Sequence, residues 1–149
     1  MVWGCPERQT DMFLGEYEVQ FTGHGRIVLP KKFRQELGKT EEVVLSRGFE
    51  GCIWGFSKEE FEKESGKQLE VPVTDKKGRD LRRYLFSAAE SAVLDYQGRF
   101  VIPRLLLEYA NLKESRVVII GAGDHFEIWN IESWKREIKK LTSKKYGNY

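Results

Sequence analysis

The chain carries one sequence pattern twice, and this internal repeat constrains its fold more strongly than any other feature. Gly25, Arg26 and Pro30 of the first copy recur at the same spacing in the second copy, within the strings GRIVLP and GRFVIP. The agreement extends to three flanking segments: 19–21 against 92–94, 43–45 against 117–119, and 53–56 against 128–131. Such self-similarity indicates a tandem repeat of roughly forty residues per copy.

Each copy has the pattern of a small unit of strand, turn and helix. An apolar run leads into a glycine-containing turn and a second short apolar run, which is a hairpin signal. Gly25 and Gly98 supply the turn position at which φ can be positive at little steric cost. Pro30 and Pro103 then end the strands and suit the first turn of a helix, because an N–H would have no partner there. We therefore expect helices over about 30–37 and 103–110.

Outside the hairpins, local signals predict further helices and strands. Ser57 followed by Glu60 is a capping-box pattern, and it predicts a helix that runs to about residue 65. Apolar residues at helical spacing predict a second helix from 74 or 75 to 91, after a linker over 66–73 that contains Pro72. The remaining expected elements are strands over 43–46 and 52–56 and an amphipathic helix over 131–141.

These features together resemble a known family. The order Gly-Arg, three apolar residues, proline and amphipathic helix is similar to the swapped-hairpin DNA-binding unit of the AbrB and SpoVT family. Two such units, with Met12–Gly15 just ahead of the first, resemble the MraZ family of bacterial transcriptional regulators over roughly residues 12–141. The resemblance implies an α+β, mainly β fold: a double swapped-hairpin β-barrel of AbrB type with a pseudo-two-fold internal repeat and flanking short helices.

The repeat and the resemblance also imply a division of the chain and a set of partners. The expected segments are an N-terminal extension over 1–11 that is disordered or non-native, a first SpoVT-AbrB-like repeat over 16–58, a linker and helix over 59–89, a second repeat over 90–133, and a helix end with a basic tail over 134–149. The implied partner is double-stranded promoter DNA of the division and cell-wall gene cluster, bound at short direct repeats. The implied assembly is a homo-oligomer in the form of a ring.

The two glycine turns are the expected DNA-binding sites. Arginine presents a planar fork that fits guanine O6 and N7, and a two-stranded ribbon is narrow enough to enter the major groove. Family members usually carry Asp-x-Lys-Gly-Arg in both turns, whereas this chain keeps the arginines but departs at Thr22, His24 and Gln97. Arg34 lies where many single-copy AbrB-like proteins carry a basic residue that helps hold DNA, and its counterpart in the second copy is Leu107. The expected DNA-binding residues are Thr22, His24, Arg26, Arg34, Asp95, Gln97 and Arg99.

A third string imitates the turn motif in a different context. Asp75–Arg79 reads DKKGR and matches the family pattern more closely than either turn does. It has no strand before it and no apolar triplet with proline after it. The context therefore identifies this string as the start of the expected second helix.

The composition indicates the class of protein, but it does not indicate where DNA would bind. A chain of 149 residues with 32% charged and 40% hydrophobic residues is typical of one compact soluble domain. The net charge of +2 is too small to indicate nucleic-acid binding by itself, so the site has to come from local clustering. No apolar run reaches the length of a membrane span or a signal peptide, so we expect a cytoplasmic, nucleoid-associated protein with no membrane partner.

The sequence gives little support for an enzyme. Cys5 and Cys52 lie far apart without metal-ligand spacing, and we interpret them as a tail thiol and a buried thiol. The two histidines, His24 and His125, form no nucleophile-and-base pattern with them, and no glycine-rich phosphate loop follows a strand. We therefore expect no catalytic residue, metal, cofactor or small-molecule substrate.

Three alternatives remain open at this point. AbrB-like barrels also serve as antitoxins that bind a protein partner, so an antitoxin-like interaction module is the alternative to a regulator, although two copies and a basic tail argue against it. Trp54 and Trp129 fit core packing better than base stacking. The basic residues of 131–149 fit a solvated helix face better than an arm that contacts phosphates.

Overall fold

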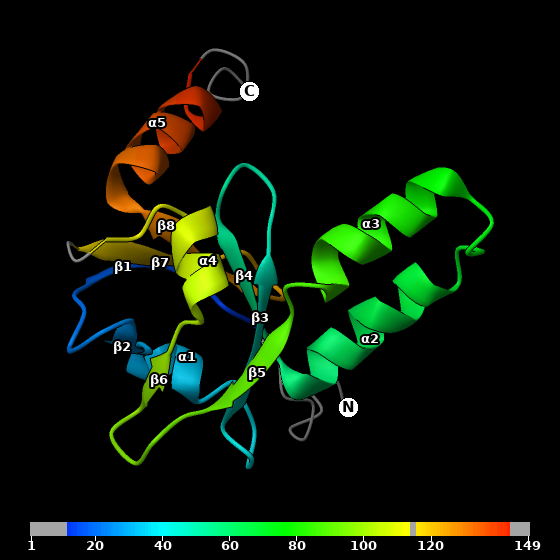
Figure 1. Ribbon diagram of the computed structural model, residues 1–149. Coiled ribbons are helices and arrows are strands. Elements are labelled where there is room, and N and C mark those ends of the chain that lie inside the picture. Colours follow the sequence, from blue (N-terminus) through cyan, green and yellow to red (C-terminus); the bar gives the residue numbers. More distant parts are fainter. Residues whose placement is uncertain (1–11, 114–115, 144–149) are drawn as a thin grey trace, which may run out of the picture.

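The computed structural model describes residues 12–113 and 116–143 (Figure 1). The expected extension over 1–11 and the tail residues 144–149 lie outside the described residues. In chain order the elements are β1 (Glu16–Val19), β2 (Arg26–Val28), α1 (Lys31–Arg34), β3 (Glu42–Arg47), β4 (Ile53–Ser57), α2 (Lys58–Leu69), α3 (Lys76–Phe86), β5 (Glu90–Val93), β6 (Arg99–Val101), α4 (Arg104–Tyr109), β7 (Val117–Gly121), β8 (Phe126–Asn130) and α5 (Ile131–Leu141).

The two copies are interleaved in one six-stranded sheet of order β1-β7-β8-β4-β3-β5. The first strand of each copy pairs with the third strand of the other copy: β1 pairs with β7, and β5 pairs with β3. At the centre, β4 pairs with β8 and places Ile53 opposite Ile128. Each copy therefore completes one edge of the sheet for the other.

A second sheet contains only β2 and β6, which pair antiparallel. These strands have three residues each and bond to one another rather than to the larger sheet. The predicted mixture of helix and strand, organised mainly on sheet, is confirmed. The strands of the described residues do not close into a barrel, because the pairing of the large sheet ends at β1 and β5.

The predicted helix starts agree with the structure. Pro30 and Pro103 occupy the residue before α1 and α4. Ser57 Oγ accepts a hydrogen bond from the Glu60 N–H at 3.1 Å, which caps α2. Asp75 caps α3 in the same way, by accepting from the Gly78 N–H at 2.8 Å. The DKKGR string is thus a helix start, as its context predicted.

The predicted ends of three helices were wrong. α1 is a single turn that ends at Arg34, and residues up to Leu37 continue as turns. α2 runs through Gly66 to Leu69, because a glycine on an exposed helix face costs only about 1 kcal/mol. α3 ends at Phe86, because the chain from Glu90 onward pairs with β3 as β5.

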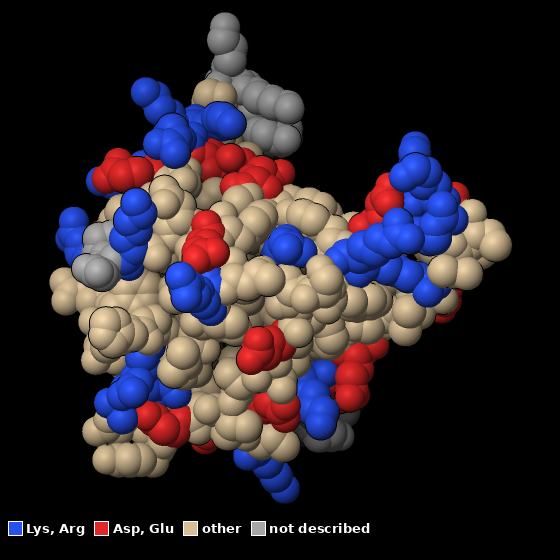
Figure 2. All heavy atoms as spheres, viewed as in Figure 1, with Lys and Arg blue, Asp and Glu red and all other residues tan. Residues whose placement is uncertain are grey.

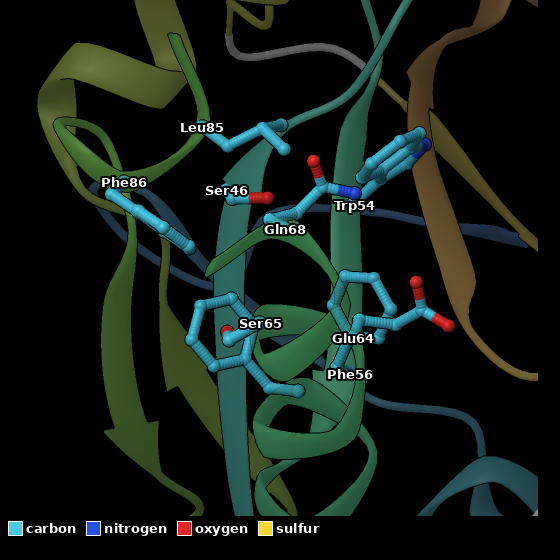
Figure 3. A pocket seen from close by; sticks show the side chains of 9 residues that line it. Ser46, Trp54, Phe56, Glu64, Ser65, Gln68, Leu85 and Phe86 are labelled. Atoms are coloured by element: carbon cyan, nitrogen blue, oxygen red, sulfur yellow. The ribbon is translucent and has the colours of Figure 1, made fainter. Parts of the chain in front are cut away.

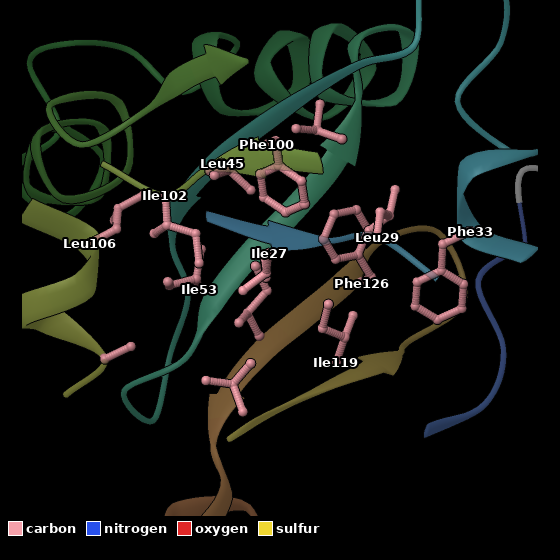
Figure 4. Packing of buried hydrophobic residues seen from close by; sticks show 14 of the residues in the cluster. Ile27, Leu29, Phe33, Leu45, Ile53, Phe100, Ile102, Leu106, Ile119 and Phe126 are labelled. Carbon is pink, nitrogen blue, oxygen red and sulfur yellow. The ribbon is translucent and has the colours of Figure 1, made fainter. Parts of the chain in front are cut away.

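Aromatic side chains from both copies form the centre of the core (Figure 4). The ring of Phe13 lies 5.3 Å from Phe33 and 5.4 Å from Phe126, centroid to centroid, with edge-to-face geometry. Ile27 of β2 and Phe100 of β6 are both buried in the same cluster. The β2–β6 pair is therefore fixed to the body of the protein by its inner face.

α2 and α3 form a helical hairpin that projects from the sheets (Figure 1). The guanidinium of Arg82 donates to the carbonyls of Leu69 and Val71, and that of Arg79 donates to Val73 and Thr74. Arg82 thus satisfies carbonyls at and just beyond the C-terminal end of α2, where a helix has unpaired acceptors, and Arg79 satisfies carbonyls of the α2–α3 connection. None of the helices in the described part of the chain is long and apolar enough to cross a membrane.

Candidate nucleic-acid interface

The β2–β6 pair presents both turn arginines on one face. Its register places Arg26 opposite Val101 and Val28 opposite Arg99. Side chains alternate along a strand, so these four lie on the face opposite to buried Ile27 and Phe100. Figure 1 shows β2 and β6 side by side, away from the α2–α3 hairpin. The structure thus brings together the two arginines that the sequence predicted.

An open groove of about 490 Å³ runs along this face, and both Arg26 and Arg99 line it. Asp95, Val93 and Val101 also line the groove, so its wall is part charged and part apolar. Val93 and Val101 are more than half exposed. Exposed valines beside cations provide apolar contact area next to hydrogen-bond donors.

The turn glycines are favoured by their backbone conformation, and their carbonyls join the two turns. Gly25 has φ +72° and Gly98 has φ +82°, in the region that favours glycine. The carbonyl of each glycine accepts a hydrogen bond from the other copy: Leu29 N–H donates to Gly98 at 2.9 Å, and Ile102 N–H donates to Gly25 at 2.7 Å. The first turn (22–26) and the second turn (95–99) are therefore held together as one unit.

Asp95 organises the second turn from within. Its carboxylate accepts from the backbone N–H groups of Arg99 and Gln97 at 2.9 Å each, and from Arg99 Nε at 2.7 Å. These bonds, led by the one from the Arg99 backbone, hold the pKa of Asp95 below its usual range. Asp95 thus stays ionised and fixes the base of the Arg99 side chain.

The first turn lacks an equivalent carboxylate. Thr22 Oγ1 donates to the Arg26 carbonyl at 3.3 Å, so it contacts the backbone of Arg26 and not its guanidinium. Among the described residues, the Arg26 side chain forms neither a hydrogen bond nor an ion pair. His24 and Gln97, the other predicted contacts, are exposed at the tips of their turns.

Arg34 reaches from α1 to the second turn. Its Nε donates to Glu41 Oε1 at 3.0 Å, and its Nη2 donates to the Tyr96 carbonyl at 3.3 Å. Its side chain is only 29% exposed and forms an ion pair with Glu41 at 2.9 Å. The ion pair of Arg34 with Glu41 was not predicted from the sequence. The only available signal was that the first copy carries Arg34 where the second copy carries Leu107.

Positive charge gathers elsewhere on the surface as well. Figure 2 shows Lys and Arg side chains over α3 and α5. On α3, Asp80 pairs with Lys76 at 2.9 Å and with Arg83 at 3.5 Å. On α5, Lys140 lies 4.0 Å from Glu137. Such surface pairs are typical of solvated helix faces and contribute little to stability.

The two tryptophans at equivalent strand positions have separate environments. Trp129 is buried against Trp134, and its Nε1 donates to Glu127 at 2.9 Å. Trp54 is half-buried and contacts the ring of Phe49 edge-to-face. The predicted core packing is confirmed for Trp129, and Trp54 packs among aromatic side chains.

A small hollow lies between the α2–α3 hairpin and the sheet (Figure 3). Its volume is about 40 Å³, far below the range of about 300–1,000 Å³ that is typical of ligand sites. Phe56, Phe61 and Phe86 provide much of its wall, and Ser46 Oγ donates to the carbonyl of Arg47. The serine hydroxyl is thus engaged with backbone.

Three carboxylates on α2 and the β7–β8 connection form an acidic cluster. Oxygens of Glu60, Glu64 and Asp124 lie within 4.8 Å of one another, a spacing compatible with a cation. Each already has a basic partner: Lys63 at 3.6 Å, Lys67 at 3.2 Å and His125 at 2.8 Å, respectively. These ion pairs balance the negative charges of the three carboxylates without a bound cation.

A partly buried polar network next to this cluster was not predicted. His125 Nε2 lies 2.9 Å from Glu127, and Nδ1 lies 2.8 Å from Asp124. Burial acts to lower the pKa of His125, but the hydrogen bonds to Glu127 and Asp124 outweigh it and raise that pKa. Burial acts to raise the pKa of Glu127, but its bonds from His125 and Trp129 lower it. Cys52 is buried beside them, and burial raises the pKa of its thiol, as expected for an unreactive cysteine.

The His125–Glu127 pair should make stability depend on pH. A histidine with a raised pKa stabilises the fold fully below its unfolded value of 6.5 and loses this effect as pH rises through the folded value. Glu127, with a lowered pKa, stabilises above 4.5 and loses its effect as pH falls through its folded value. We expect His125→Gln to lower the free energy of unfolding by about 2 kcal/mol at pH 5.5 and by clearly less at pH 9.

Urea unfolding of both proteins at the two pH values measures this difference. His24→Gln, at an exposed turn position, is the matched control and should change the free energy of unfolding by about 0.5 kcal/mol or less. An equal loss at pH 5.5 and pH 9 for His125→Gln would contradict the ion-pair explanation.

Comparison with known proteins places the chain in a family. The family model described as "MraZ protein, putative antitoxin-like" matches twice, over residues 12–84 and 85–146. The transcriptional regulator MraZ of Caldicellulosiruptor saccharolyticus is 41% identical over 127 residues, which covers 85% of this chain and 87% of that protein. The transcriptional regulator MraZ of Leifsonia xyli subsp. xyli is 43% identical over 129 residues, which covers 87% of this chain and 88% of that protein. The transcriptional regulator MraZ of Lactiplantibacillus plantarum is 40% identical over 125 residues, which covers 84% of this chain and 86% of that protein. The chain belongs to the MraZ family.

Proposed function

We propose that this protein is a sequence-specific DNA-binding transcriptional regulator that acts on the promoter of the division and cell-wall gene cluster. The observation that carries the proposal is the pair of arginines, Arg26 and Arg99, on one outer face of the β2–β6 ribbon. The relatives named above as transcriptional regulators support it. The protein would act in the cytoplasm, at the nucleoid.

In the proposed mechanism the β2–β6 ribbon enters the major groove. Arg26 and Arg99 direct their forks at guanine edges or at phosphates, because a guanidinium can donate two parallel hydrogen bonds to either. His24 can donate to a phosphate when protonated, and Gln97 can pair with adenine. Thr22 and Asp95 shape the turns that carry these donors. No cofactor, metal, membrane or small-molecule substrate enters this mechanism.

Binding by one subunit would be modest and sensitive to salt, because few phosphates are neutralised. A homo-oligomeric ring that binds short direct repeats raises the effective concentration of every further site after the first has bound. The exchange of β1 and β5 between the copies supports a double swapped-hairpin architecture as the scaffold. Its two repeats would be 16–58 and 90–133, joined by 59–89 and flanked by 1–11 and 134–149.

An antitoxin-like protein-interaction module is the second candidate, and the description of the family model favours it. Its partner would be a small protein rather than DNA. Co-purification of the tagged protein from its native host, with and without nuclease, distinguishes the two. A stoichiometric protein partner that remains after nuclease treatment supports the module.

DNA binding can be tested with a fluorescent fragment of the region upstream of the protein's own gene, with a scrambled fragment as competitor. We expect specific binding that weakens with salt. Arg26→Ala and Arg99→Ala should each weaken binding by at least about tenfold, and together by at least about hundredfold, because each removes a bidentate contact.

Arg83→Ala is the matched control, since Arg83 lies on α3 and pairs with Asp80. This variant should bind as the wild type does. Circular dichroism and light scattering establish that every variant stays folded and keeps its assembly. The regulator proposal fails for this DNA if the wild type binds the upstream fragment no better than the scrambled one.

A further inference from the structure

The two DNA-facing turns are related by the internal repeat, but their supporting residues differ. Each turn is packed against the helix of the other copy. A Cβ at Gly98 would lie 3.1 Å from Arg34 of α1, and a Cβ at Gly25 would lie 3.1 Å from Leu107 of α4. Arg34 and Leu107 occupy equivalent positions in the two copies, so the same site holds a cation in one case and an aliphatic side chain in the other.

The second turn is held by two charged side chains. Asp95 accepts from two backbone N–H groups and from Arg99 Nε. Arg34 donates to the Tyr96 carbonyl and is itself held by Glu41. Both contacts act on the segment that carries Arg99.

The hydrogen bonds of Arg99 leave the two terminal nitrogens of its guanidinium free to contact a ligand. Asp95 contacts only Nε, and within the described residues neither terminal nitrogen of Arg99 has a partner. These two nitrogens form the edge that makes an end-on bidentate contact with a guanine or a phosphate. The guanidinium is thus oriented before any ligand binds.

The first turn has neither support. Thr22 replaces the carboxylate, and Leu107 replaces the arginine, so nothing in the described residues fixes the Arg26 guanidinium. Arg26 therefore has more freedom to lose on binding than Arg99. Ordering one long side chain on binding weakens affinity by about two- to tenfold.

We infer that Arg34 is a positioning residue that acts through the second turn to hold Arg99 in its DNA-binding orientation, so that the two turns of one chain bind DNA unequally. This inference rests on the proposed function. It differs from the sequence-based expectation, in which Arg34 contacts DNA. Its charge is engaged by Glu41 and its hydrogen bonds point to protein, which favours the positioning role.

A double-mutant cycle on the upstream DNA fragment separates positioning from direct contact. Arg34→Leu introduces the residue that the second copy carries at this position. We expect it to weaken binding about fivefold in the wild type and in Arg26→Ala, and to have no effect in Arg99→Ala. A fivefold loss that persists in Arg99→Ala would overturn the inference, because Arg34 would then act independently of Arg99.

The conservative variant Arg34→Lys gives a second readout. Lysine keeps the positive charge but cannot make the Nε and Nη2 bonds together. We expect Arg34→Lys to lose as much affinity as Arg34→Leu. Full rescue by lysine, with an unchanged salt dependence, would mean that Arg34 serves as a charge near phosphate.

A measurement without DNA tests the positioning itself. Hydrogen exchange and ¹⁵N relaxation of arginine side chains should show a protected, rigid Nε–H for Arg99 and a mobile one for Arg26. Arg34→Leu should make the Arg99 side chain more mobile. The double variant Thr22→Asp with Asp95→Thr should protect the Nε–H of Arg26 and leave that of Arg99 unprotected. Equal mobility of the two arginines in the wild type would overturn the inference. If the wild type fails to bind the DNA specifically, the proposed function fails, and this measurement still decides whether Arg34 orders Arg99.

Discussion

Phe126→Ala is expected to lower the free energy of unfolding by about 3–5 kcal/mol, because it removes a fully buried ring from the centre of the core. Phe126 contacts Phe13 edge-to-face at 5.4 Å and lies 5.9 Å from Phe33. On its other side it packs directly over Gly55, where an added Cβ would lie 2.2 Å from the ring. A cavity at this position would therefore loosen residues from both copies.

Chemical unfolding monitored by circular dichroism measures this loss. Tyr96→Ala is the matched control, because Tyr96 is an aromatic residue whose side chain is 84% exposed. The control should change stability by about 0.5 kcal/mol or less. A loss below about 1 kcal/mol for Phe126→Ala would mean that the core around it is not packed as the structure describes.

Gly121→Ala is expected to destabilise the protein by about 3 kcal/mol, although it adds only one methyl group. A Cβ at Gly121 would lie 2.2 Å from the Phe13 carbonyl oxygen and 2.3 Å from its carbon. This segment cannot move aside easily, since Phe13 N–H donates to Gly123 at 2.8 Å and Gly121 N–H donates to Gly15 at 2.8 Å. Relief of the overlap would break these hydrogen bonds.

Gly66→Ala is the same substitution, but it is expected to stabilise the protein. Gly66 lies within α2, and a Cβ added there would meet open space, with no atom within 4 Å beyond its own stretch of helix. Alanine there should raise the free energy of unfolding by about 0.5–1 kcal/mol, because glycine is the poorer helix former. Differential scanning calorimetry of both variants tests the pair, and a similar shift in Tm for the two would refute the backbone overlap at Gly121.

Local features of the fold were predictable because their causes lie within a few residues. Positive φ at Gly25 and Gly98 and the caps at Ser57 and Asp75 depend on short-range sterics and hydrogen bonds. Strand partners depend on the whole chain. Nothing in residues 16–19 indicates that they lie at the sheet edge beside β7, or that the sheet stops there without closing.

The candidate site shows the same division. The repeated motif and the family that it resembles pointed to Arg26 and Arg99, and the register of β2 and β6 places them on one face. The contact of Arg34 with Tyr96 joins residues far apart in sequence, so no local pattern could predict it. Glu127 and Trp129 had a local signal that was missed, since alternate residues of one strand share a face, whereas His125 lies just before β8 and no strand pattern includes it.

The exchange of first strands between the copies also governs how the chain can fold during synthesis. Glu16 of β1 has Ile120 as its partner, so β1 leaves the ribosome long before β7 exists. At typical rates of translation the wait is on the order of ten seconds. During that time the first copy has no β5 beside β3 and no β8 beside β4, and its strand edges stay open. Folding of this sheet is therefore a late event, which begins when the second copy emerges.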